Sequence, residues 1–215
     1  MAAAVLSGNP SRGRANGTGV VEDRASQLLE IACRLFATRG YEGTSLRDIA
    51  EEAQITKAAL YYHFPNKEAL YQHIVIENMQ ALVDRVSAAV AQAGSATDKV
   101  RAFMLTSADI YAESPHAWVA GSNAFWSGMG QDSRAATISR RDQYEKVLRR
   151  CIAQGVASGE FREVDPAIAG RLLLSSMNQL SRWHTPTGPL SPREVIEQYL
   201  DILLRGLTRT PSGGS

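Results

Sequence analysis

Apolar residues recur at three- and four-residue intervals through most of the chain, a spacing that predicts α-helices rather than β-strands. A first helix is predicted from Glu22 to Arg39, because one of its faces is apolar and Gly40 follows it; that face carries Leu28, Ile31, Ala32, Leu35 and Phe36. No segment has the two-residue alternation of a half-buried strand. The pattern therefore predicts an all-α protein of about nine helices.

The stretch from Thr44 to Tyr71 has the pattern of two short helices joined by a tight turn near Gln54. Ser45 and Asp48 have the spacing of a capping box, and Leu46, Ile49, Ala50 and Ala53 share one helical face. The second helix is predicted from about residue 56 to residue 64, followed by Pro65 and by Asn66 as the cap of a third. This arrangement is typical of a helix-turn-helix, whose second helix enters the DNA major groove.

Polar and aromatic side chains crowd onto the second of these helices, whereas an ordinary solvent-exposed helix more often carries Glu and Lys. Tyrosine hydroxyls, ammonium groups and an imidazole suit the phosphate oxygens that position a protein on a duplex. The N-terminus of the preceding helix is a further candidate phosphate site. The candidate DNA-binding residues are Thr44, Ser45, Arg47, Thr56, Lys57, Ala59, Tyr61, Tyr62, His63 and Lys67.

The run TKAALYYHFPNKEALY, with the helix before it, resembles the DNA-binding signature of the TetR/AcrR family of ligand-responsive transcriptional regulators. The resemblance implies a helix-turn-helix domain at residues 22–70 and a larger helical ligand-binding and dimerisation domain at 71–209. It also implies a homodimer that reads a palindromic double-stranded operator and a small-molecule effector that releases it. One departure is Ala58, where many members carry Gly; its methyl group would hinder a close approach of the helix backbone to DNA at that point.

The chain beyond residue 66 predicts one helix after another. The helices are expected at about 66–92, 96–113, 115–128, 133–158, 166–183 and 192–207. The last two are apolar over a wider arc than one core-facing side needs. The family resemblance implies that they form a four-helix dimer interface with a second subunit; their use as ordinary core is the alternative.

The helices between about residues 80 and 183 must enclose any effector pocket. Such pockets have apolar walls with a few polar groups, although aromatic residues at helical spacing are also common in ordinary cores. The candidate ligand-binding residues are Phe103, Tyr111, Trp118, Phe125, Trp126, Tyr144, Met177 and Arg182.

Two C-terminal segments are similar to the regulatory domain of TetR-type repressors of fatty-acid, aromatic-acid and steroid breakdown. They are FREVDPAIAG and MNQLSRWHTPTGPLSPREVIEQYLDILLRGL. Several of those repressors are released from DNA by acyl-CoA thioesters. The resemblance implies a pocket for an acyl chain, with Arg140, Arg141 or Arg182 near the CoA phosphates. The alternatives are a drug or aromatic metabolite as effector, and a DNA-binding protein without ligand control.

Composition and motifs exclude some classes of function but do not indicate one. The net charge of the 215 residues is +1, and residues 1–70 contain eight basic and eight acidic residues. Bulk charge therefore does not indicate a nucleic-acid partner. The four histidines and two cysteines lack metal-site spacing, and no nucleophile elbow or phosphate loop is present. We therefore expect neither catalysis nor a metal or cofactor.

The ends of the chain are expected to lack structure. Residues 1–21 read as a disordered tail, with a DNA-contacting arm as the alternative, and residues 210–215 as a disordered C-terminus. No apolar run is long enough for a membrane span, and MAAAVLSG is too short and uncharged for a signal peptide, so a cytoplasmic protein without a membrane partner is expected. Cys33 and Cys151 are expected to be reduced core residues, with a redox switch as the alternative.

Overall fold

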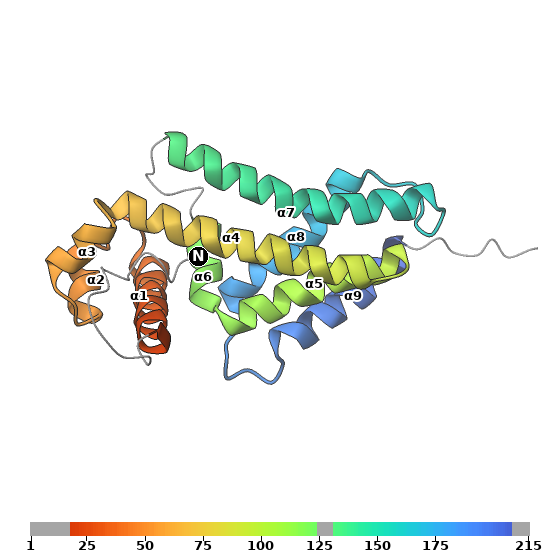
Figure 1. Cartoon of the computed structure of the whole chain (residues 1–215). Coiled ribbons are helices and arrows are strands. Elements are labelled where there is room, and N and C mark those ends of the chain that lie inside the picture. The colour runs from red at the N-terminus through yellow and green to blue at the C-terminus, as the bar shows by residue number, and fades with distance from the viewer. Residues whose placement is uncertain (1–17, 124–130, 208–215) are drawn as a thin grey trace, which may run out of the picture.

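A computed structural model describes residues 18–123 and 131–207, which form nine α-helices and no β-strand (Figure 1). The all-α prediction is therefore confirmed. The helices are α1 Thr18–Arg39, α2 Leu46–Glu52, α3 Lys57–His63, α4 Lys67–Gln92, α5 Ala96–Glu113, α6 Pro115–Asn123, α7 Gln131–Ala157, α8 Pro166–Trp183 and α9 Pro192–Leu207.

Most predicted helix starts are confirmed, because each is encoded by a local cap. Ser45 and Asp48 form the predicted capping box of α2, and Asn66 Oδ1 accepts a hydrogen bond from Ala69 N at 2.8 Å at the start of α4. A further capping box at Ser95, which was not predicted, opens α5.

Two boundaries differ from the prediction. Helix α1 begins at Thr18, so residues 18–21 are helical, whereas the sequence predicts that they belong to a disordered tail. Helix α6 is described only to Asn123, so its predicted continuation towards residue 128 lies outside the described residues.

The buried side chains form two separate clusters. The first, here called the N-terminal core, joins α1, α2, α3 and the first half of α4; it includes Phe36, Ile49, Leu60, Leu70 and Tyr71, together with Ala120 of α6. The second, the C-terminal core, joins the rest of α4 to α5, α7, α8 and α9 around Phe103, Leu148, Ile152, Leu173 and Leu200. Helix α4 contributes to both clusters and connects the two parts of the molecule (Figure 1).

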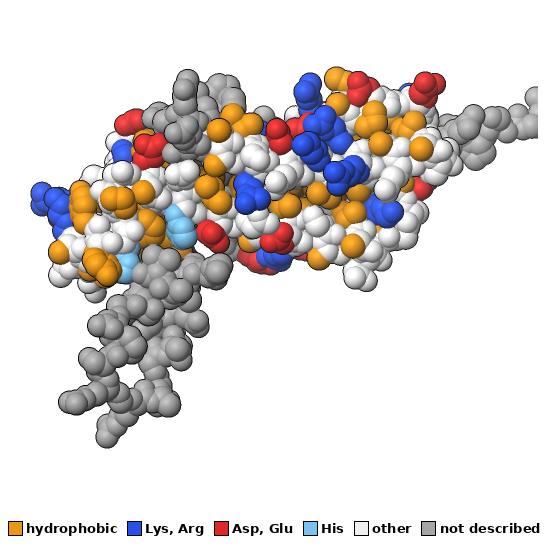
Figure 2. Space-filling model, turned by 45° about the horizontal axis from the view of Figure 1, so that its top comes forward, with side chains coloured by type: hydrophobic (Ala, Val, Ile, Leu, Met, Phe, Trp, Pro, Cys, Tyr) orange, Lys and Arg blue, Asp and Glu red, His pale blue; other side chains and the backbone are white. Residues whose placement is uncertain are grey.

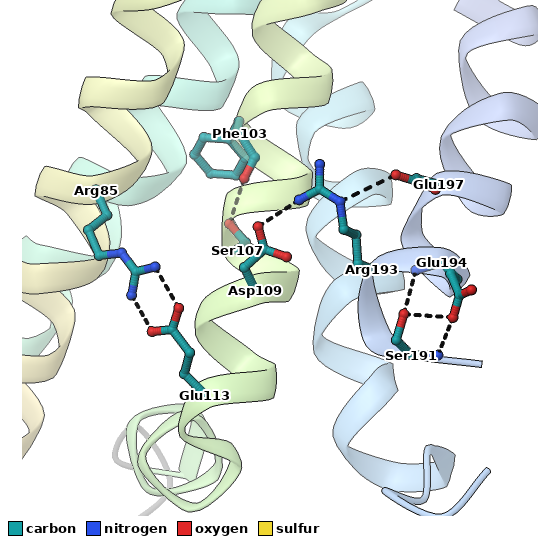
Figure 3. A network of polar contacts seen from close by, with 9 residues as sticks. All are labelled: Arg85, Phe103, Ser107, Asp109, Glu113, Ser191, Arg193, Glu194 and Glu197. Carbon is teal, nitrogen blue, oxygen red and sulfur yellow. Dashed lines mark hydrogen bonds and ion pairs between the residues drawn. The ribbon is translucent and has the colours of Figure 1, made fainter. Parts of the chain in front are cut away.

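Ion pairs hold α9 against α5. Arg101 Nη2 lies 2.6 Å from Asp201 Oδ1. Arg193 Nη1 lies 2.6 Å from Asp109 Oδ2, a pair that Figure 3 shows. Exposed pairs of this kind stabilise by no more than about 1 kcal/mol each, so they fix the position of α9 more than they stabilise the fold. None of the described helices is long and apolar enough to cross a membrane.

Candidate nucleic-acid interface and ligand cavity

Helix α3 buries one side chain and exposes nearly all the others. Leu60 is fully buried, whereas Lys57, Ala58, Ala59, Tyr61 and Tyr62 are exposed. Tyr62 is 80% exposed, although a tyrosine of an ordinary monomer is usually more than half buried. Thr56 caps the helix by accepting a hydrogen bond from Ala59 N at 3.1 Å. The predicted second helix of the helix-turn-helix is thus a short rod with one face anchored and the other face open.

The open face of α3 is basic and aromatic. The helix contains no acidic residue, and the Lys57 ammonium lies over the Tyr61 ring, 5.3 Å from its centroid. The Tyr62 and His63 rings meet edge to face at 5.0 Å. The acidic residues of the neighbouring α2 are occupied elsewhere, because Glu51 pairs with Arg47 and Glu52 with Arg34, both at 2.7 Å. This face can therefore donate hydrogen bonds to phosphate oxygens and stack against sugars or bases.

The turn between α2 and α3 is tight and slightly strained. Gln54 lies in the left-handed region at φ 53°, where the predicted turn falls. A side chain in that region costs about 1 kcal/mol, so the packing of Ile49 and Leu60 on either side must hold the turn closed.

Three candidate DNA-binding residues have internal roles; the sequence indicated the capping role of Ser45, but not the roles of Thr44 and Lys67. Thr44 is buried, and its hydroxyl lies 2.9 Å from Gly40 O and 3.2 Å from Leu35 O, so it fastens the end of α1 rather than facing a phosphate. The Ser45 hydroxyl is engaged with Asp48 in the capping box. Lys67 is three-quarters buried, and its ammonium donates to Tyr41 O at 2.8 Å and lies 4.2 Å from the centroid of the Tyr41 ring.

A cavity of about 460 Å³ lies between α4, α5, α6, α7 and α8. This volume is within the usual range for small-molecule sites. Its apolar lining includes Met79, Leu82, Ile110, Trp118 and Leu174, and its polar lining includes Asn78, Arg85, Glu113, Thr137, Arg141, Glu145, Arg171, Ser175 and Asn178.

The candidate ligand-binding residues divide into two groups. Trp118 and Tyr144 line the cavity, as does Arg141. Phe103, Tyr111 and Met177 are buried in the C-terminal core and do not line the cavity themselves, although the Phe103 ring packs against Tyr144 and the Tyr111 ring against Trp118. Arg182 is exposed outside the cavity. Phe125 and Trp126 lie outside the described residues. Arg85 and Arg171 were not predicted, although each stands out in the sequence as a charge within a largely apolar helical stretch.

Arg85 and Glu113 form a bidentate ion pair between α4 and α5 at the edge of the cavity (Figure 3). The two nitrogen–oxygen distances are 2.5 and 2.8 Å. The hydrogen bonds from Arg85 lower the pKa of Glu113, and those to Glu113 raise the pKa of Arg85. Both groups are therefore charged at neutral pH, and each neutralises the other.

Two side chains of the cavity wall have well-defined hydrogen-bonding capacity. Ser107 Oγ donates to Phe103 O at 2.8 Å, so the Tyr144 hydroxyl, 2.7 Å away, must be the donor to Ser107 and keeps only acceptor capacity. Burial raises the pKa of Tyr144, against the lowering effect of the Ser107 hydrogen bond, so the phenol stays protonated. Trp118 Nε1 is buried without a hydrogen-bond partner among the described residues.

The two halves of the fold define a class: a helix-turn-helix DNA-binding unit joined to a helical domain that encloses a ligand cavity. Comparison with known proteins agrees. Residues 28–74 match the family described as bacterial regulatory proteins, tetR family, and residues 93–207 match the tetracyclin repressor-like C-terminal domain. The chain therefore belongs to the TetR family of transcriptional regulators, as the sequence of its recognition helix predicted.

Curated relatives match nearly the whole chain. The HTH-type transcriptional repressor KstR2 of Mycobacterium tuberculosis (strain H37Rv) is 30% identical over 193 residues, covering 89% of this chain and 96% of the relative. KstR2 of Mycolicibacterium smegmatis is 31% identical over 198 residues, covering 87% and 92%.

Solved structures share the same arrangement. The TetR-family regulator PfmR of Thermus thermophilus is 37% identical with a TM-score of 0.78, covering 85% of this chain and all of that one. AibR, solved in complex with isovaleryl coenzyme A and operator DNA, is 27% identical with a TM-score of 0.75, covering 83% and 97%.

Proposed function

We propose that this protein is a homodimeric transcriptional repressor that binds a palindromic operator through α3 and is released from it by an acyl-CoA thioester. The observation that carries the proposal is the position of α6, which belongs both to the wall of the cavity and to the N-terminal core. A ligand in the cavity therefore touches an element on which the DNA-binding unit is built.

The contacts of α6 are direct. Ala117 lines the cavity and packs against the N-terminal core, and Ala120, one turn further on, is buried within that core. The Tyr71 hydroxyl of α4 donates to Ala120 O at 2.8 Å. A ligand that favours a different position of α6 would displace α4 and α3 with it, and DNA would favour the original position.

A second connection runs from α4 to α1. Asn78 lines the cavity, and its Nδ2 lies 3.7 Å from the thiol sulfur of Cys33 in the N-terminal core. Burial raises the pKa of Cys33 to about 11, so the thiol stays protonated, which supports the structural role expected for it rather than a redox switch.

The face that would form the dimer is apolar and exposed. On α8, Ile168 and Leu172 lie one turn apart and are 61% and 57% exposed, and on α9 Ile202 is 70% exposed. Exposed apolar side chains grouped on adjacent helices indicate a protein interface. A second copy packed face to face by two-fold symmetry would cover them and place two α3 helices side by side for a palindromic site.

The choice of an acyl-CoA effector rests on similarity. AibR was solved with isovaleryl coenzyme A, and KstR2 is described as a ketosteroid transcriptional regulator. A non-CoA hydrophobic effector and DNA binding without ligand control are the rival functions. We also propose that the protein has no catalytic role and acts in the cytoplasm, where its DNA target would lie.

The test is fluorescence anisotropy with the DNA that flanks the protein's own gene, titrated first with salt and then with a series of acyl-CoA thioesters. We expect tight, salt-sensitive binding that at least one thioester abolishes. The matched control is Tyr62→Ala, which removes the most exposed ring of α3 and should abolish binding in a protein that still melts cooperatively.

The alternatives give distinct results. Specific binding that no thioester affects would retain the regulator and exclude CoA esters in favour of another effector. Binding with a steep salt dependence but no preference for the flanking DNA over random DNA would contradict a specific repressor of that gene.

A further inference from the structure

The open face of α3 has a small residue at its centre. Leu60 is fully buried, and Ala58 and Tyr62 lie two residues before and after it, so each is about 160° around the helix axis from the anchored side. Both Ala58 and Tyr62 are exposed. The middle of the face that points away from the N-terminal core therefore consists of one methyl group and one tyrosine side chain.

The longer side chains around Ala58 make their contacts with one another and leave its methyl group exposed. The Lys57 ammonium lies over the Tyr61 ring, and the Tyr62 ring meets the His63 ring edge to face. At the end of the molecule that carries α3, Figure 2 shows orange hydrophobic side chains beside blue Lys and Arg side chains. This face thus offers cations for the phosphates of DNA and an apolar group for its bases.

Ala58 occupies the second position of α3, in the part of the helix that would lie nearest the bases. The second helix of a helix-turn-helix contacts base edges with its N-terminal residues. The side chain of Ala58 has no hydrogen-bonding group, and its Cβ holds the backbone away from the base edges. A base opposite Ala58 therefore meets a methyl group, and a polar atom that it presents there loses water without gaining a partner.

Of the four bases, thymine alone presents an apolar group in the major groove. This group is the C5-methyl, whereas the major-groove edges of adenine, guanine and cytosine are recognised through hydrogen-bond donors and acceptors. We propose that Ala58 determines sequence specificity by packing its methyl group against the C5-methyl group of a thymine, once in each half of the operator. This inference rests on the proposed function and specifies one base of the DNA that α3 reads.

The size of the effect follows from the apolar surface that such a contact removes from water. One buried methyl group corresponds to about a fourfold change in affinity. A dimer makes the contact in both half-sites, and the two contacts are too far apart to influence each other. Their effects should therefore multiply to about fifteenfold.

The experiment begins with the full-length wild-type protein and a library of random duplexes, from which repeated selection of bound DNA gives the preferred palindromic sequence. Each thymine of that sequence is then replaced by deoxyuridine, symmetrically in both halves. Deoxyuridine pairs like thymine and lacks only the C5-methyl group. Fluorescence anisotropy gives the affinity of the wild type, Ala58→Gly and Ala59→Gly for every duplex, and thermal melting by circular dichroism verifies that each variant is folded.

We expect one symmetric pair of uridines to weaken wild-type binding about fifteenfold and to change the binding of Ala58→Gly by less than twofold. Ala59→Gly is the matched control, because it removes one exposed methyl group from the same helix and lowers helix propensity equally. It should retain the full uridine effect at that pair. Each comparison is between two duplexes bound by one protein, so a loss of helix stability in a variant cancels.

A second measurement uses the wild type alone and does not depend on the folding of a variant. Replacing the same two thymine–adenine pairs by cytosine–guanine pairs should weaken binding. Replacing them by 5-methylcytosine–guanine pairs should recover part of the loss, because the methyl group returns to the same place in the major groove. A 5-methylcytosine duplex that binds no better than the cytosine duplex would exclude a methyl contact.

Two further results would overturn the assignment and are distinguishable from a failure of the proposed function. If every uridine substitution affects the wild type and Ala58→Gly equally, Ala58 reads no methyl group, while the selected sequence still supports a specific DNA-binding regulator. The same holds if no uridine substitution weakens wild-type binding. If selection yields no preferred sequence, both this inference and the palindromic operator of the proposed function fail.

Discussion

At the residue scale, the two lysines of the recognition motif have different tasks although they read alike in the sequence. Lys57 lies on the open face of α3, exposed, and forms no ion pair within the described chain. Lys67 lies three-quarters buried between Tyr41 and Glu42, with its ammonium against a carbonyl and a ring. One is available to DNA, and the other joins the end of α1 to the start of α4.

Lys67→Met should lower the free energy of unfolding by about 1 kcal/mol, because a partly buried hydrogen bond and a cation–π contact are lost together. Lys57→Ala should change it by less than about 0.5 kcal/mol while weakening operator binding and relaxing discrimination among operators. Urea unfolding and anisotropy on the same two variants measure both quantities. A Lys67→Met protein as stable as the wild type would contradict this structural role and would favour the predicted role of Lys67 as a phosphate contact.

Residue roles were predictable from sequence where they depend on neighbours in the chain. The capping box of α2 and the Asn66 cap of α4 involve residues three positions apart, so spacing reveals them. The burial of Thr44 depends on where the last turn of α1 lies, and no local pattern contains that information.

At the scale of elements, α6 is the part of the fold whose role could not have been predicted. The sequence places an aromatic-bearing helix after Ser114, but its contact with the N-terminal core depends on how α4 and α1 pack. The same reason explains the mixed outcome for the cavity. Amphipathic spacing identifies which side chains point inward, whereas the cavity arises from the spacing of five helices, so Phe103 and Met177 were indistinguishable from Trp118 and Tyr144.

Tyr71→Phe should reduce the coupling between effector and operator without abolishing either binding event. It removes the hydrogen bond from α4 to the backbone of α6 and leaves the Ala120 carbonyl without that donor. We expect the ratio of operator affinities without and with saturating octanoyl-CoA to shrink by a factor of about 2 to 30, the range of coupling changes of about 0.5–2 kcal/mol.

The measurement for Tyr71→Phe is anisotropy at fixed salt with and without the ester. Tyr199→Phe is the matched control, because it removes a tyrosine hydroxyl from α9, far from α6 in the chain. An unchanged ratio in Tyr71→Phe, alongside intact folding, would show that α6 transmits the signal through packing alone.

At the scale of the whole molecule, the exposed apolar face of α8 and α9 is the main feature that a single chain leaves unexplained. Leu172→Asp combined with Ile202→Asp should convert the dimer to a monomer, because two charges on each subunit would be buried at its centre. Sedimentation velocity measures the assembly state, and operator affinity should fall because the two α3 helices are no longer linked.

The control for the dimer variant is Leu190→Asp, a similar change at a partly exposed leucine in the loop between α8 and α9. It should leave the assembly state unchanged. A Leu172→Asp/Ile202→Asp protein that still sediments as a dimer would place the interface on another face.

The length of α4 has a mechanical consequence. Its 26 residues span about 39 Å at 1.5 Å per residue, with the cavity along its middle, from Asn78 to Arg85, and α3 just before its first turn. A tilt of only about five degrees at one end would displace the other by about 3 Å, which is close to the rise of one base pair. Helix α4 thus acts as a lever arm. A rearrangement at the effector that is too small to disturb the C-terminal core can still move helix α3 out of register with the DNA major groove.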